Sequence, residues 1–156
     1  MLIFDRAVLK KYWPADDKGD EDEIVRQVVM QMEAEVDNSM QIGELFTNMV
    51  RGLVKVVLAD NLTGEEYEIK AATIKPFNVK QKKVKIGKGD DSDFVRTEFV
   101  AMNIVSRLDD ERQGQMLTDL YRFFNIELQL RIEEFTIPAQ ASESENMDTD
   151  MDENEE

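Results

Sequence analysis

Seven lysines between Ile69 and Gly89 are the residues of this chain whose type and spacing best suit binding chemistry. Ammonium groups at this density neutralise phosphates, and an aromatic ring among them, Phe77, could stack on an unpaired base. The segment therefore predicts a contact surface for single-stranded nucleic acid or for an acidic protein partner. Arginine is absent from it, so bidentate reading of bases is not expected. We call these residues the lysine strip: Lys70, Lys75, Lys80, Lys82, Lys83, Lys85 and Lys88.

The lysine strip also fits a purely structural role. Lysines on an edge strand deter pairing between the sheets of neighbouring molecules. A strand over Val79–Ile86 would place Val84 and Ile86 on one face and alternate lysines on the other. Both interpretations, a binding surface and a protected edge, follow from the same residues.

The last sixteen residues have the opposite charge. Residues 141–156 lack the apolar content that offsets the entropy of ordering, so we expect a disordered acidic tail after a single globular domain over residues 1–140. The tail is either a solubilising appendage or a tethered competitor for the lysines. A basic surface with an acidic terminal tail is similar in layout to single-strand-binding proteins. The candidate tail contacts are Glu143, Glu145, Asp148, Asp150, Asp152, Glu153, Glu155 and Glu156.

Composition argues against catalysis. With neither cysteine nor histidine, the chain has no thiolate nucleophile, no imidazole base and none of the commonest zinc ligands. Gly87-Lys88-Gly89 lacks the spacing of a phosphate loop, and the aspartates near Asp16 and Asp91 do not have the spacing of a calcium loop. We therefore expect a protein that is not an enzyme and that has no cofactor and no metal site.

The formal charge of −15 disfavours non-specific attraction to DNA or to anionic lipid. No apolar run approaches the length that spans a bilayer, and no basic leader followed by an apolar segment is present. The sequence therefore predicts a soluble, cytoplasmic protein without a membrane partner.

The predicted fold class is α+β, with four to five helices packed on a small, mainly antiparallel sheet. Apolar residues at three- and four-residue steps indicate most of these helices. The expected helices are a brief one from Asp5 to Trp13, a second over Asp22–Val36, a third from Ile42 to Leu53, a fourth after Asp93 through Leu108, and a fifth from Asp109 to Phe124.

Three regions favour strands. A hairpin is expected over Leu53–Ile74, with Gly64 in its turn, although a helix continuing to Leu58 competes with it. Val79–Ile86 is a third strand. Strict alternation of apolar and polar residues predicts a fourth over Ile126–Glu134.

Methionines near the first long helices, Met30, Met32, Met40 and Met49, suit either an ordinary core or an adaptable face for apolar partner segments. Our leading hypothesis is a non-enzymatic protein-interaction or assembly adaptor of chaperone type. The alternative is a single-stranded nucleic-acid-binding protein regulated by its own tail. A third hypothesis is an acidic decoy that imitates nucleic acid.

Overall fold

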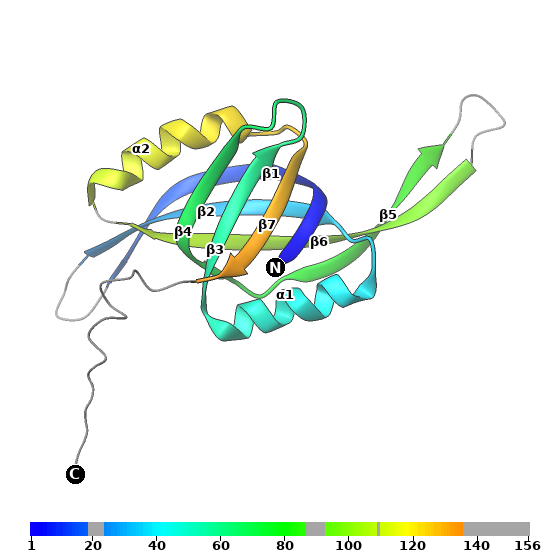
Figure 1. The fold of residues 1–156 in the computed structure, drawn as a ribbon, viewed down its shortest axis with the longest axis horizontal. Coiled ribbons are helices and arrows are strands. Elements are labelled where there is room, and N and C mark those ends of the chain that lie inside the picture. The colour runs from blue at the N-terminus through cyan, green and yellow to red at the C-terminus, as the bar shows by residue number, and fades with distance from the viewer. Residues whose placement is uncertain (19–23, 87–92, 109, 136–156) are drawn as a thin grey trace, which may run out of the picture.

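The computed structural model describes residues 1–18, 24–86, 93–108 and 110–135. Within this part of the chain, antiparallel strands predominate and two α-helices are present (Figure 1). The elements are β1 (Leu2–Lys18), β2 (Ile24–Glu35), α1 (Ser39–Arg51), β3 (Leu53–Asp60), β4 (Glu66–Ile74), β5 (Asn78–Ile86), β6 (Asp93–Leu108), α2 (Asp110–Leu120), a 3-10 turn η3 (Tyr121–Phe123) and β7 (Leu128–Glu134).

Six of the strands form a closed ring. Their order is β2-β1-β7-β3-β4-β6, and a further antiparallel pairing between β2 and β6 joins the two ends. Figure 1 shows β3, β4 and β7 crossing in front of β1, β2 and β6, with α1 and α2 on opposite sides. Closure leaves the paired parts of these six strands without free edges.

β5 lies outside the ring and pairs with the first half of β6. The register runs from Asn78 opposite Ala101 to Ile86 opposite Asp93. Beyond Phe99, where the pairing of β6 with β2 ends, this ribbon of two strands projects from the body (Figure 1). We call it the β5–β6 arm.

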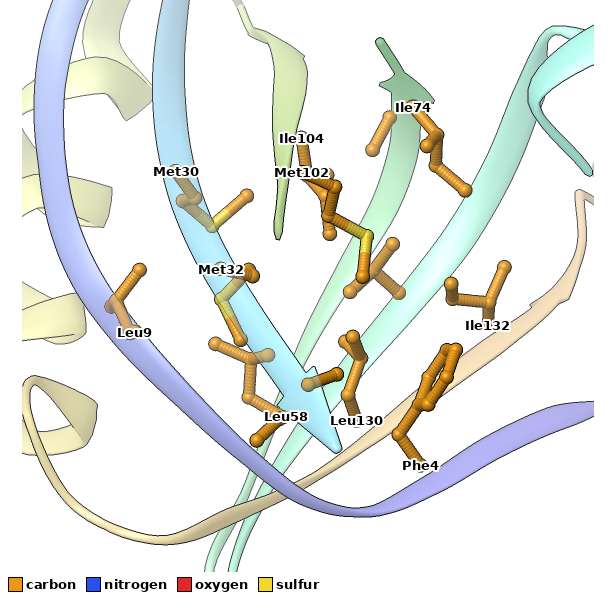
Figure 2. Close-up of a cluster of buried hydrophobic side chains, with 14 of the residues drawn as sticks. Phe4, Leu9, Met30, Met32, Leu58, Ile74, Met102, Ile104, Leu130 and Ile132 are labelled. Atoms are coloured by element: carbon orange, nitrogen blue, oxygen red, sulfur yellow. The ribbon is translucent and has the colours of Figure 1, made fainter. Parts of the chain in front are cut away.

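The core fills the space between the two crossing layers. Inward-facing side chains on every ring strand alternate with outward-facing ones, as the pleat of a strand requires. Figure 2 shows how ten of them converge: Phe4, Leu9, Met30, Met32, Leu58, Ile74, Met102, Ile104, Leu130 and Ile132.

The predicted α+β fold, with four to five helices on a small sheet, is wrong, because the described chain consists mostly of antiparallel strands in one seven-stranded sheet with two α-helices. Three of the segments expected as helices are strands. The segment expected as a helix over Asp22–Val36 contains β2, and the segment before Leu108 is β6. In β2 the fully buried residues Val28, Met30, Met32 and Ala34 follow a period of two. The helical spacing was misleading because the outer face of the strand also carries half-buried valines, so that apolar residues occur on both faces.

The first expected helix is also a strand. In β1 the buried residues are Leu2, Phe4, Ala7 and Leu9, and the step of three between Phe4 and Ala7 coincides with a shift of register against β7. Such a bulge changes which residues face inward. Because the bulge interrupts the alternation of buried and exposed residues, the strand could not be recognised from the sequence.

The other element predictions are confirmed. α1, α2, the β3–β4 hairpin, β5 and β7 occupy the expected regions. Within α1 the buried face is Gln41, Leu45 and Asn48, whereas Phe46 is 55% exposed.

A buried hydroxyl connects two ring strands. Ser106 on β6 is fully buried, and its Oγ accepts a hydrogen bond from Val28 N–H (3.1 Å) and donates one to the Val28 carbonyl (3.2 Å). The hydroxyl therefore adds a side-chain link between β2 and β6 at this position.

Candidate functional site

The structure separates the lysine strip instead of gathering it. Lys70 lies on β4, Lys75 just beyond β4, and most of the others on β5. Phe77 is half-buried and packs against the core. The side chain of Lys85 and the whole of Lys88 lie outside the part of the chain that the structure describes.

Two lysines of β5 are engaged by one carboxylate. Glu33 on β2 is 13% exposed, and its two oxygens lie 2.8 Å from Lys80 Nζ and 2.6 Å from Lys82 Nζ. Lys82 also lies over the ring of Phe99, at 5.0 Å from the centroid. Burial raises the pKa of Glu33, but the hydrogen bonds and charges of the two lysines outweigh it and hold the pKa below 4.5.

The opposite face of the β5–β6 arm carries two cations that are not engaged by Glu33. Lys83 on β5 and Arg96 on β6 are exposed and stand directly opposite each other in the register. Like charges in this position repel, and neither makes an ion pair with another described residue. Arg96 donates a hydrogen bond to Gln81 at 3.3 Å. The arm therefore presents an uncompensated pair of cations on the face away from Glu33.

β5 is the terminal strand of the described sheet, as the edge-strand interpretation predicts. The eight tail contacts proposed from the sequence, Glu143 to Glu156, lie outside the described residues. Competition between the tail and the lysines therefore stays a prediction.

A second surface surrounds α1. Because one stripe of the helix packs against the ring, the opposite face is solvent-exposed, and it carries large apolar side chains where polar ones would be usual. Met40 is 71% exposed, Phe46 55% and Val50 67%. Gly43 lies on the same face, and a Cβ placed there would meet no atom within 4 Å.

A groove of about 710 Å³ runs along the adjoining flank of α1, and of the three exposed apolar side chains only Met40 lines it. Its walls come from α1 on one side and from the ends of β1 and β7 on the other, which ring closure brings to the helix. We call it the α1 groove; its lining includes Met1, Met40, Gly43, Thr47, Ile132 and Glu134. Glu44 also lines it, and Arg51 Nη1 lies 4.0 Å from Glu134.

Only part of the apolar surface around α1 was predictable from the sequence. Of the four methionines near the first expected helices, Met30 and Met32 belong to the core, Met49 is half-buried and Met40 alone of these is exposed. The exposure of Phe46 and Val50 was missed because their spacing also suits a buried stripe. Only the orientation of the helix on the ring decides which residues it buries.

Among the described residues, no group of three or more acidic side chains is arranged to hold a metal ion. In the same part of the chain, no helix is long and apolar enough to cross a membrane. Comparison with protein-family models, with curated proteins and with solved structures gives no match.

Proposed function

We propose that this protein is a non-enzymatic adaptor that binds a basic, apolar segment of a partner protein in the α1 groove. The observation that carries the proposal is the exposure of Met40, Phe46 and Val50 on one face of a single helix. Exposed apolar groups that cluster beside a groove are typical of docking sites.

The charge around the groove supports a basic partner segment. Glu44 and Glu134 lie at the groove, and the chain as a whole carries −15. A second copy would bring the same negative charge to the same surface, which disfavours self-association. A segment with apolar residues along one face and lysine or arginine beside them complements both features, and Gly43 allows close approach of its backbone.

Site-specific crosslinking tests the proposal. A photoreactive amino acid replaces Thr47 in the groove and, as a matched control, Thr118 on the exposed face of α2. In the native cell, position 47 should give one discrete adduct with another protein, and position 118 should not. Met40→Ser should remove the adduct while thermal unfolding shows a folded chain.

The crosslinked peptide of the partner, identified by mass spectrometry, should combine apolar residues with a net positive charge. A dimer of this chain at position 47, or the same adducts from both positions, would refute the proposal. So would a crosslinked segment that is acidic or wholly polar.

A second candidate function, binding of single-stranded nucleic acid, is favoured by the opposed cations Lys83 and Arg96. A polyanion at this face would relieve their mutual repulsion and release its own counterions. The surface is narrower than the lysine strip suggested, because Glu33 already engages Lys80 and Lys82.

Fluorescence anisotropy with a labelled oligonucleotide at low salt tests this second candidate. Lys83→Gln with Arg96→Gln should weaken binding at least about tenfold, whereas Lys10→Gln with Lys11→Gln, an equal loss of charge on β1, should have little effect. Deletion of residues 141–156 should tighten binding if the tail competes. An equal effect of the two double variants, or no binding by the shortened chain, removes nucleic acid from consideration.

A further inference from the structure

A pocket of about 470 Å³ lies between α2, β4 and the end of β6. Its helix, α2, is on the opposite side of the ring from α1 (Figure 1). This volume is within the range of sites for small molecules. Its apolar lining includes Ile69 and Met116, both nearly fully buried, together with the half-buried Leu108 and Ala71. We call it the α2 pocket.

Three cationic side chains also line the α2 pocket: Lys70, Arg107 and Arg112. Lys70 and Arg107 are exposed at their tips and make no hydrogen bond or ion pair with another described residue. Arg112 is close enough to Tyr67 for its charge to act on the pKa of that phenol. In a chain of charge −15, such a local gathering of cations beside an apolar cavity is unexpected from composition.

The two carboxylates at the pocket have other partners. Glu68 lies 2.8 Å from Lys55 Nζ. Asp119 accepts hydrogen bonds from Gln115 Nε2 at 2.9 Å and from the Tyr67 hydroxyl. Burial and the neighbouring Asp119 raise the pKa of Tyr67, so the phenol stays protonated and continues to donate to that carboxylate. Lys55 and, more weakly, Lys70 lower the pKa of Glu68, so the charge of Lys70 is partly offset, whereas Arg107 forms no ion pair with another described residue.

We propose that the α2 pocket binds a small amphipathic anion, a ligand with one carboxylate, sulfonate or phosphate group on an apolar body. The apolar body would lie against Ile69, Leu108 and Met116. Arg107 and Lys70 would hold the anionic group at the mouth, and the guanidinium of Arg107 can do so with two hydrogen bonds. This site is independent of partner docking at α1.

The probe is 8-anilinonaphthalene-1-sulfonate, an aromatic sulfonate whose fluorescence rises in an apolar site. Arg107→Gln and Lys70→Gln should each weaken its affinity roughly five- to tenfold, the loss expected of one charge-assisted contact. Lys10→Gln, which removes a charge elsewhere, is the matched control. Ala71→Leu should block the pocket and abolish the signal, with thermal unfolding confirming that the chain is folded.

Because the dye could bind the apolar face of α1, Phe46→Ser is measured in parallel and should leave most of the signal. Displacement by decanoate points to an acyl anion, and displacement by adenosine monophosphate points to a nucleotide. If Phe46→Ser abolishes the signal and Ala71→Leu does not, the proposal is overturned and the groove at α1 is the apolar site. Equal displacement by decanol and decanoate also overturns it, since the cations would then have no role.

Discussion

Glu33→Gln is the substitution that best tests how the β5–β6 arm is held to the ring. The carboxylate of Glu33 joins β2 to Lys80 and Lys82 on β5, whereas backbone pairing joins β5 to β6. Glutamine keeps the shape and one acceptor oxygen but removes the charge. The variant therefore isolates the electrostatic part of this connection.

The expected loss of stability in Glu33→Gln follows from the solvent exposure of Lys80 and Lys82. Both lysine side chains are 45% exposed, so solvent screens the pairs and each is worth about 0.5–1 kcal/mol. Together they predict a loss of about 1–2 kcal/mol, which is roughly 3–6 °C in Tm for a chain of this length. Glu35→Gln removes the same charge from the same strand, where the partner is Arg6 at 3.7 Å and 67% exposed, and it should cost less than about 0.5 kcal/mol.

Urea unfolding followed through Trp13, the sole tryptophan, measures the loss, and hydrogen exchange locates it. Amides of β5 should exchange faster in Glu33→Gln than in Glu35→Gln, while those of β3 should not change. Equal stability and equal exchange in the two variants would contradict the assignment of Glu33 as an anchor of the arm. If the arm also binds polyanions, the freed lysines should tighten that binding.

Four further outcomes are expected. The stability difference between wild type and Glu33→Gln should be constant at neutral pH and shrink as pH falls below 4.5, because the folded-state pKa of Glu33 lies below its ordinary value and its contribution is lost on protonation; a difference that grows in acid would reverse the sign of our reasoning. Ser106→Ala leaves the buried N–H and carbonyl of Val28 without their hydroxyl partner and should cost about 2–3 kcal/mol by urea unfolding, against less than about 0.5 for the exposed Thr118→Ala. Gly43→Ala should stabilise α1 by about 1 kcal/mol because a Cβ meets nothing there, whereas Gly52→Ala, at φ +100°, should destabilise; the same sign for both in thermal unfolding would contradict this. Phe46→Ser should leave Tm within about 2 °C of wild type, since an exposed side chain contributes little to the core; a larger drop would show that Phe46 is structural.

Secondary structure was predictable in segments where the apolar residues follow a single period. β7 alternates strictly, and its inward residues Leu128, Leu130 and Ile132 are all buried. The β3–β4 hairpin was predictable from β-branched residues around a glycine turn, and Gly64 indeed has a positive φ of 80°.

Sequence reasoning failed where strands carry apolar residues on both faces or contain a bulge. β2 and β6 carry half-buried side chains on their outer faces as well as fully buried ones on their inner faces, so a period of two does not stand out in their sequences. Ring closure itself was not predictable, because it depends on pairings such as β1 with β7 between distant segments. For the same reason the α1 groove could not be predicted, since its walls come from both ends of the described chain.

The sequence contains a signal that the lysines of the lysine strip lie on two different faces of the strand. Lys80 and Lys82 are two residues apart and therefore share a face of a strand, whereas Lys83 must point the other way. Extending the alternation expected around Val84 and Ile86 back to Lys80 and Lys82 would have separated these two lysines from Lys83. The position of Glu33 opposite the first pair required the register.

The position of β7 in the ring has a consequence for biosynthesis. β7 is inserted between β1 and β3, although it is the last strand of the described chain and β1 is the first. While the ribosome is still making residues before Leu128, the flanks of β1 and β3 that later pair with β7 have no partner. A nascent chain therefore leaves these strand edges unpaired until β7 has been made, which delays closure of the ring and exposes backbone groups that can pair with other chains in the meantime.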